Sequence, residues 1–331
     1  MRGPETGKLT EWFAALPSRG GKTLDPTALD LAAKEKLSAV LEELFGTPAA
    51  PRVPEPAATT LGLSDSVLAE GSRQYRRQCA HCHGLTGEGR GPTGDWILPR
   101  PRDLRRGVVK FGSAPGGIPT RADLTKVIRR GVPGTAMQPF GLLSDGELDA
   151  LAAAAMHLGI RGEVEFRLTR TLLEDPPDDL AAEAKAVTAN VLARWTAVPV
   201  IGPTDPMAGR DEDEFAPPYF ESIRRGYALF GSTKSGCGSC HQDFGRTEKW
   251  LYDVWGTAAR VTDLTSGVFR GGSSPEELFR RVRFGIPAAE MPACPGLSDA
   301  EVWDLVHFVR AASKPARLPA DVKAMIYSGG H

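Results

Sequence analysis

Apolar residues recur at helical spacing along several stretches of this chain. The first stretch begins near Asp25, carries leucine, valine or alanine every three or four positions, and stops at Gly46. This spacing predicts one amphipathic helix. Residues 47–56 contain four prolines, which is typical of an extended linker. Further helices are expected over residues 64–77, 147–158 and 178–198. The pattern as a whole predicts an all-α fold.

A five-residue pattern, C-x-x-C-H, occurs twice. It is formed by Cys79, Cys82 and His83, and again by Cys237, Cys240 and His241. Two thiols one helical turn apart can each bond to one vinyl group of the same porphyrin, and the imidazole that follows can bind the iron. The pattern is typical of covalent haem attachment. We therefore expect two haem c groups, with His83 and His241 as iron ligands.

Two other uses of paired cysteines fit the chain less well. A zinc ribbon places two C-x-x-C pairs about 15–20 residues apart, whereas these pairs lie in different halves of the chain and each has its own histidine. A thioredoxin-like dithiol follows a strand, and no Val/Ile-rich segment precedes either pair. The fifth cysteine, Cys294, is left over, and we expect a packed thiol there rather than a reactive one.

The second half of the chain repeats the first, which indicates an internal duplication. A glycine and an aromatic residue four positions apart precede each motif, and a methionine in a Gly/Pro-rich loop follows it. Each methionine loop leads into a Leu-Ser-Asp sequence that starts a last helix. A short x-Asp-Leu sequence also recurs. The corresponding residues are Gly71 and Tyr75 with Gly226 and Phe230, Met137 with Met291, Leu143 with Leu297, and 102–104 with 262–264.

Each half resembles a class I cytochrome c domain, over residues 61–160 and 220–313. The resemblance implies that the glycine lets the first helix cross closely against the last one. It also implies that Met137 and Met291 bind the iron opposite the histidines. In such domains a proline carbonyl after the motif accepts a hydrogen bond from the axial imidazole, and Pro92 is the candidate for this role.

The two copies differ in their last helices. Asp149 and Ala154 of the first copy stand where the second has Trp303 and Phe308. The first copy therefore lacks the aromatic residue that usually packs against the glycine in this family, which puts its helix contact in doubt. Other residues of these helices that could serve as iron ligands are expected to be packing or surface residues instead: Met156, His157 and His307.

The predicted organisation is two cytochrome c-like haem domains in tandem with additions. The parts are an N-terminal helical extension (1–60), a first haem domain (61–160), a partly helical acidic connector (161–219), a second haem domain (220–313) and a C-terminal tail (314–331).

Charge is unevenly distributed, although the formal net charge is only −1. Lys and Arg outnumber Asp and Glu by 13 to 9 over residues 61–160, and the ratio is 6 to 12 over residues 161–219. Arginines stand at positions 100, 102, 105 and 106 without interleaved aromatics or a known nucleic-acid motif. We expect a solvated face or partners for haem propionates there, and no nucleic-acid binding.

Ligation by histidine and methionine would fill both axial positions of each iron and raise its reduction potential. The resemblance therefore implies electron transfer between other redox proteins rather than catalysis. Two alternatives stay open. One is a di-haem oxidoreductase, peroxidase-like or thiosulfate-oxidising, with a switchable ligand near Cys294. The other is a cytochrome subunit of a membrane-associated respiratory complex.

Covalent haem attachment generally implies assembly outside the cytoplasm. The first residues lack the apolar segment of a signal peptide, and no stretch has the length of a membrane helix. We expect a periplasmic or otherwise extracytoplasmic protein from which a signal or an N-terminal membrane anchor has been removed.

Overall fold

The structure, a computed structural model, describes residues 16–17, 23–25, 28–198, 203–208, 217–253 and 258–327. These residues are mostly helical, which confirms the predicted all-α class. They include two small hairpins, β1 (Leu16–Pro17) with β2 (Thr23–Leu24) and β3 (Trp250–Tyr252) with β4 (Ala258–Arg260). The chain divides into two compact units, residues 1–108 with 118–198 and residues 109–117 with 199–331. In the ranges described, no helix is long and apolar enough to cross a membrane.

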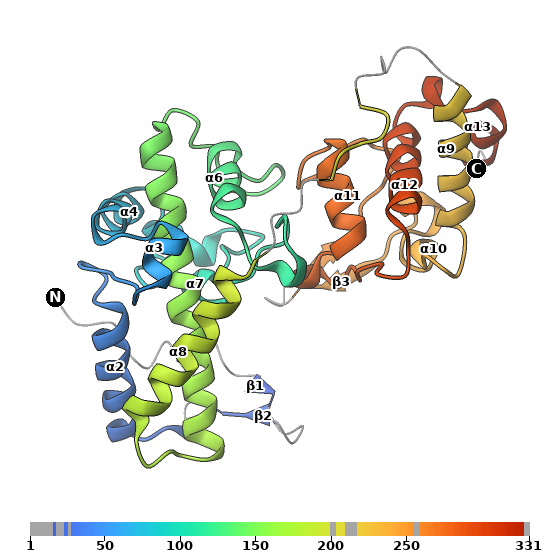
Figure 1. Cartoon of the computed structure of the whole chain (residues 1–331). Coiled ribbons are helices and arrows are strands. Elements are labelled where there is room, and N and C mark those ends of the chain that lie inside the picture. Colours follow the sequence, from blue (N-terminus) through green and yellow to red (C-terminus); the bar gives the residue numbers. More distant parts are fainter. Residues whose placement is uncertain are drawn as a thin grey trace. The chain divides into compact units, whose positions relative to one another are not determined.

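The first unit is built around one long helix, α7 (Asp145–Glu174). Its other main helices, α2, α4, α6 and α8, all pack against α7, and Figure 1 shows α2 and α8 beside its lower half. Their bounds are α2 (Leu31–Phe45), α4 (Asp65–Gln78), α6 (Arg121–Arg130) and α8 (Leu180–Thr196). The short elements are α3 (Ala57–Leu61), α5 (Ala80–His83), η3 (Gly94–Trp96) and η4 (Leu104–Arg106).

Helix α7 is longer than its sequence pattern suggested. It was expected to end near residue 158, but it continues to Glu174 because its buried apolar stripe continues. Ile160, Val164 and Leu168 on this extension are fully buried. The predicted boundary at residue 160 therefore falls inside a helix of this unit.

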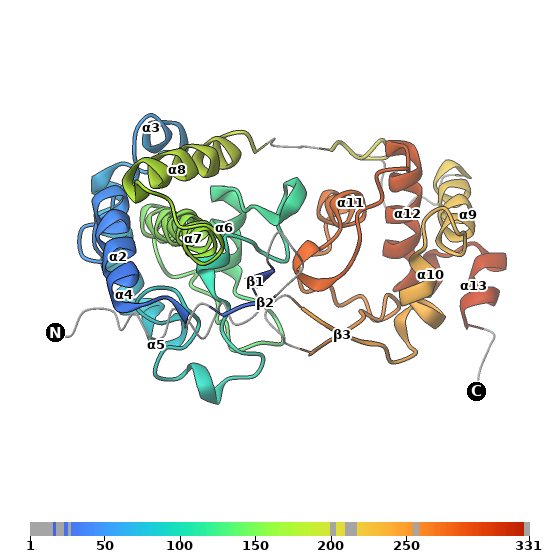
Figure 2. The same ribbon diagram turned by 90° about the horizontal axis from the view of Figure 1, so that it is seen from below.

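The N-terminal helix and the connector helix supply the surfaces that bury the extension of α7. Helices α2 and α8 lie against it and against each other (Figure 2). Phe45 of α2 and Trp195 of α8 are almost completely buried. The Glu163 carboxylate of α7 accepts hydrogen bonds from Arg194 and from the indole N–H of Trp195, at 3.2 Å for the indole. The two elements are thus part of the hydrophobic core of the first unit.

Helix α2 begins later than predicted. Its N-terminal cap is Asp30, whose carboxylate accepts a hydrogen bond from the backbone N–H of Ala33 at 2.7 Å. The helix therefore starts at Leu31 rather than near Asp25, and it ends at Gly46 as predicted.

His157 joins α7 to the end of α2. Its ring is buried, and Nε2–H donates to the backbone carbonyl of Phe45 at 3.0 Å. Burial lowers the pKa of His157 to about 4, although the hydrogen bond to Phe45 favours the charged form. The ring is therefore neutral near pH 7 and is a packing residue.

A glycine sits where the first and last helices of each motif-bearing region cross. A Cβ atom on Gly71 of α4 would lie 2.1 Å from the backbone oxygen of Ala150 and 3.1 Å from the Ala154 side chain. On Gly226 it would lie 2.0 Å from the oxygen of Asp304 and 2.8 Å from Phe308. The close crossing is present in both units. The first unit achieves it with Ala154 in place of an aromatic residue.

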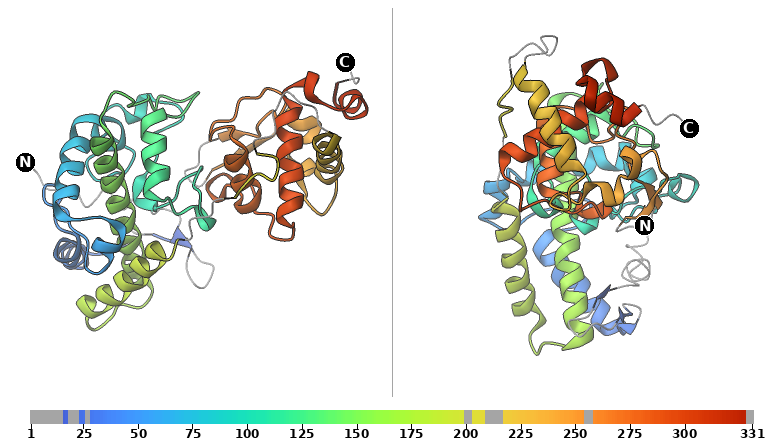
Figure 3. Two further views of the ribbon diagram at one scale, coloured as in Figure 1. Left: turned by 45° about the horizontal axis from the view of Figure 1, so that its top comes forward. Right: turned by 90° about the vertical axis from the view of Figure 1, so that its right-hand side faces the viewer.

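The second unit contains the other motif. Figure 3 shows its helix α12 packed against α9. The elements are η5 (Pro115–Gly117), α9 (Pro217–Phe230), α10 (Cys237–Cys240), η6 (Gln242–Gly245), α11 (Pro275–Phe284), η7 (Pro287–Ala289), α12 (Asp299–Ala312), η8 (Pro315–Arg317) and α13 (Ala320–Tyr327). Val322 and Ile326 of α13 are buried, so this part of the predicted tail packs into the core.

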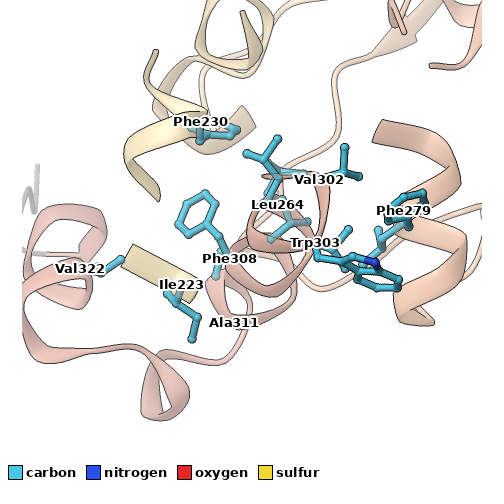
Figure 4. Packing of buried hydrophobic residues seen from close by; sticks show 14 of the residues in the cluster. Ile223, Phe230, Leu264, Phe279, Val302, Trp303, Phe308, Ala311 and Val322 are labelled. Atoms are coloured by element: carbon cyan, nitrogen blue, oxygen red, sulfur yellow. The ribbon is translucent and has the colours of Figure 1, made fainter. Parts of the chain in front are cut away.

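Aromatic rings fill the core of the second unit (Figure 4). The Phe308 ring of α12 lies 5.4 Å from that of Phe230, centroid to centroid, and Trp303 lies 4.7 Å from Phe279. Such pairs add about 0.5–1.5 kcal/mol each to the burial of their surfaces. Trp303 and Phe308, which replace Asp149 and Ala154 of the first copy, therefore give the second unit an aromatic core that the first unit lacks at these positions.

A buried polar network holds the connector segment against α9 and α12. The Ser222 hydroxyl donates to Asp304 at 2.6 Å and lies 2.7 Å from Nδ1 of His307. Nε2 of His307 is 3.1 Å from the Asp205 carboxylate. The His307 ring is buried, and both of its nitrogens have hydrogen-bond partners. His307 is therefore a packing residue that joins these segments.

We expect Gly71→Ala to lower the free energy of unfolding by about 1–3 kcal/mol, because the added methyl group overlaps a backbone carbonyl that cannot move freely. Urea unfolding of the holoprotein followed by circular dichroism measures this. Gly146→Ala is the matched control in the same unit, because a Cβ atom there meets nothing within 4 Å. Equal stability of the two variants would contradict the close crossing.

We expect stability to fall as the pH drops from about 6.5 to about 4. In this window the unfolded chain binds a proton at His157 and the folded chain does not, so protonation favours unfolding. The loss attributable to this ring is on the order of 3 kcal/mol. His157→Gln keeps an N–H donor without titrating, so urea unfolding of the variant between pH 7 and pH 4 should show a shallower pH dependence. Identical slopes would refute the assignment.

Candidate functional site

The first C-x-x-C-H sequence forms a single helical turn directly after α4. Helix α4 ends at Gln78, and α5 (Ala80–His83) follows, with Cys79 between them. Gly84 has φ +78° and ends the turn, and its carbonyl accepts a 2.8 Å hydrogen bond from the buried hydroxyl of Tyr75. The aromatic residue four positions after the helix-crossing glycine therefore holds the end of the motif in place.

The His83 imidazole is oriented by a backbone carbonyl. Its Nδ1 lies 2.9 Å from the carbonyl oxygen of Arg102. A carbonyl oxygen only accepts, so Nδ1 carries the proton and Nε2 presents its lone pair. Burial lowers the pKa of His83, which favours the neutral ring that a metal ligand requires.

The expectation for Pro92 is corrected here. The carbonyl that accepts from His83 is that of Arg102, not of Pro92. Pro92 is exposed and lies between Gly91 and Thr93, whose N–H groups donate to the carbonyls of Cys82 and His81 at 3.0 Å each. Its loop therefore packs on the backbone of the motif itself.

The second unit repeats this arrangement. Nδ1 of His241 lies 3.2 Å from the carbonyl oxygen of Thr262, and burial lowers the pKa of His241. In each unit the next residue is an aspartate whose carboxylate accepts from the backbone N–H two residues on, at 2.8 Å: Asp103 from Arg105, and Asp263 from Thr265. This turn fixes the carbonyl that orients the imidazole.

The carbonyls of Arg102 and Thr262 were not predicted as acceptors from the sequence, although one sequence pattern marks their positions. They belong to the repeated x-Asp-Leu sequence, and Leu104 and Leu264 also make equivalent backbone bonds, to Gly87 at 2.8 Å and to Phe244 at 2.9 Å. Every residue has a backbone carbonyl, so the type of residue does not show which carbonyl accepts from the imidazole. The only indication in the sequence is that both copies have x-Asp-Leu at this place.

The two methionine loops have the same backbone structure. The N–H of Val132 donates to the carbonyl of Met137 at 2.9 Å, and the N–H of Ile286 donates to that of Met291 at 2.8 Å. The glycine before each donor has φ near +65°, at +63° for Gly131 and +70° for Gly285. Both methionines are half-buried and lie between a short helix and the start of the last helix. Met156, by contrast, is buried in α7 as a packing residue.

These features fit covalent haem c at both motifs. Each imidazole is held in the tautomer that exposes Nε2, and all five cysteines are free thiols. Burial raises the pKa of Cys79 to about 12 and raises that of Cys237, so both are thiols near pH 7. Within the described ranges no three His, Cys, Asp or Glu residues are grouped to hold a metal ion.

Cys294 lies beside the second motif. Its thiol donates to the carbonyl of Ser235 at 3.8 Å, and the thiol of Cys237 approaches the same oxygen at 3.9 Å. Burial, with Cys237 nearby, raises the pKa of Cys294. Cys294 follows Met291 by three positions, as Phe140 follows Met137. The carbonyls of both residues accept from the N–H of the leucine three positions on, at 3.3 Å for Leu297 and 3.1 Å for Leu143.

The basic residues after the first motif have carboxylate partners. Arg105 forms a buried ion pair with Asp103 at 2.8 Å. Arg100 pairs with Asp95 at 3.3 Å on the surface, and Lys110 pairs with Asp253 at 2.9 Å in the second unit. This part of the chain therefore contributes to folding as well as to surface charge.

Comparison with known proteins agrees with this geometry. The family model described as cytochrome c oxidase, cbb3-type, subunit III matches residues 66–153 and 221–309, together more than half of the chain. Among solved structures, a chain of the Kuenenia stuttgartiensis reducing HAO-like protein complex is similar, with a TM-score of 0.50 and 24% identity, covering 74% of this chain and 96% of that chain. This likeness shows the fold. No curated protein matches the chain.

We expect Gly285→Ala to disturb the second methionine loop alone. A Cβ atom there would lie 2.4 Å from the carbonyl oxygen of Met291, at a φ that alanine rarely adopts. The variant should lose about 1–3 kcal/mol of stability and should alter the visible spectrum of one haem. Gly296→Ala, where a Cβ atom meets nothing within 4 Å, is the control. Unchanged spectra and stability would refute the loop geometry.

Proposed function

The chain belongs to the cytochrome c oxidase, cbb3-type, subunit III family, and from this premise we propose that it carries single electrons between extracytoplasmic redox proteins through two haem c groups. The two matched regions are cytochrome c domains, which bind haem c and transfer electrons through it. We further propose that the axial ligands are His83 and Met137 at one haem iron and His241 and Met291 at the other.

The observation that carries this proposal is that the site occurs twice with the same parts. In both units a backbone carbonyl orients the imidazole. In both units the methionine also lies in a loop that begins at a glycine and is closed by a hydrogen bond to the methionine carbonyl. Chance packing would not reproduce both loops in units whose cores differ. The repeated parts therefore favour a role shared by both units.

Axial methionine suits a carrier better than an enzyme. Haem iron held by histidine and methionine exchanges single electrons and has no open position for a substrate. The chain's part is to orient each imidazole, to hold each methionine loop rigid and to keep the surroundings mostly apolar. These tasks match the hydrogen bond that orients His83 and the aromatic core of the second unit.

An oxidoreductase with a switchable ligand at the second haem is the competing function. The observation that motivates it is Cys294, three residues after Met291. Two observations weigh against it: the thiol donates to the carbonyl of Ser235, in the segment before the motif, and burial raises the pKa of Cys294. A protonated, hydrogen-bonded thiol is a poor iron ligand.

The third possibility is a subunit of a membrane-associated respiratory complex, which the family description suggests. In such a complex the N-terminal helix and the connector, which lie outside the matched regions, would be the attachment elements. Helices α2 and α8 bury their apolar faces within the first unit, so attachment through them would use their exposed faces. An extracytoplasmic location stays part of this proposal, because haem c is generally attached there.

We expect Met137→Ala and Met291→Ala each to lower the potential of one haem by roughly 0.1 V or more, within the ~0.8 V span that axial ligands cover. Each should also open that haem to cyanide or carbon monoxide. Potentiometric titration with visible spectroscopy measures this, and Met156→Leu is the control that should leave both potentials unchanged. Unchanged potentials in the methionine variants would refute the ligand assignment, and turnover of peroxide by the unmodified protein would favour the oxidoreductase.

A further inference from the structure

The loop between His83 and the Arg102 carbonyl carries three large apolar side chains on its surface. Trp96 is 87% exposed, Leu98 is 85% exposed and Leu85 is 63% exposed. Removing apolar surface from water is favourable by about 25 cal/mol per Å², so neighbouring exposed apolar side chains on one loop can stabilise a complex in which a partner covers them. The same loop carries Arg90 and Arg100 at exposed positions, and its one exposed acid is Asp95.

This loop is anchored directly on the first haem-attachment turn. Gly91 and Thr93 donate to Cys82 and His81, and the Thr93 hydroxyl lies 3.3 Å from the Cys82 thiol. A Cβ atom on Gly91 would lie 2.4 Å from the carbonyl oxygens of Ala80 and His81, so no larger residue could approach so closely. Trp96 and Leu98 are thus only three to five residues from a contact with an attachment cysteine.

The second unit exposes aromatic side chains at the corresponding place. Its β3 strand lies between His241 and the Thr262 carbonyl, and Trp250 and Tyr252 on one face of it are 58% and 65% exposed. Both loops contain paired cations: Arg260 pairs with Glu248 at 3.2 Å, as Arg100 pairs with Asp95 at 3.3 Å in the first unit. The overall charge differs, however. Lys and Arg outnumber Asp and Glu by 13 to 9 over residues 61–160, whereas the ratio is 11 to 11 over residues 220–313. An acidic partner therefore fits the first haem domain better than the second.

We propose that Trp96 and Leu98, together with Arg90 and Arg100 of the same loop, form the docking surface for an acidic redox protein that exchanges electrons with the first haem. The inference rests on the proposed carrier function and names the partner's chemistry: an apolar contact area surrounded by carboxylates. Buried tryptophan and arginine residues supply much of the energy of such contacts. Complementary charge speeds encounter by tenfold or more at low salt.

Stopped-flow reduction of the oxidised holoprotein by reduced flavodoxin, an acidic electron-transfer protein, tests this. We expect the phase that accounts for one haem to slow with rising ionic strength. Arg90→Glu with Arg100→Glu should slow it about tenfold at low salt and little at high salt, because the effect is electrostatic. Trp96→Ser with Leu98→Ser should slow it about tenfold at every salt concentration.

The controls lie on α2, away from the motif in sequence. Leu31→Ser removes another exposed apolar side chain, and Lys36→Glu reverses another exposed charge. Both should leave the rates unchanged. Rates in the loop variants equal to those of the unmodified protein, or slowed equally by the controls, would overturn the docking surface.

Reduction by dithionite separates the two proposals. If dithionite reduces both haems in every variant, a negative flavodoxin result removes the docking surface and leaves the carrier function. Haems that dithionite cannot reduce would overturn both. Concentration-dependent dimerisation in analytical ultracentrifugation, lost in Trp96→Ser with Leu98→Ser, would assign the surface to a second copy of the chain and also overturn the proposal.

Discussion

The close crossing of two helices at a glycine is the constraint on which each unit depends. The helix before the crossing ends at the C-x-x-C-H turn, and the helix after it begins just beyond the methionine loop. Because a Cβ atom would overlap a backbone oxygen at about 2 Å in either unit, only glycine lets the backbones approach this closely. The crossing therefore fixes the imidazole side of the site relative to the methionine side.

Around this shared crossing the two units are stabilised by different means. The second fills its core with aromatic rings, among them Phe230, Phe308 and Trp303. The first has alanines on its last helix at the crossing and extends that helix, so that α2 and α8 can cover it. The first unit thus has small side chains at the crossing and buries additional apolar surface along the extension of α7.

Buried polar groups join segments that are far apart in the chain. His157 donates to the end of α2 as a neutral ring, whereas His307 lies between Ser222 and Asp205 and contacts both. Burial raises the pKa of Asp205, but the hydrogen bonds from His307 and from the N–H of Met207 outweigh it, so the pKa is lowered overall. One buried histidine thus binds a backbone carbonyl and the other a carboxylate, and each joins segments that are distant in the sequence.

The sequence alone was sufficient for the cofactor, the helical class and the duplication, because C-x-x-C-H, helical periodicity and paired loops are local patterns with a direct chemical meaning. It also predicted the capped starts of the last helices, and the structure shows capping boxes at Ser144 and Ser298. Only the tertiary structure could show that Arg102, not Pro92, accepts from His83, since every residue has a carbonyl and its position depends on how the loop folds. The length of α7 and the burial of α2 and α8 likewise depended on packing, because an apolar stripe continues as a helix only when other segments cover it.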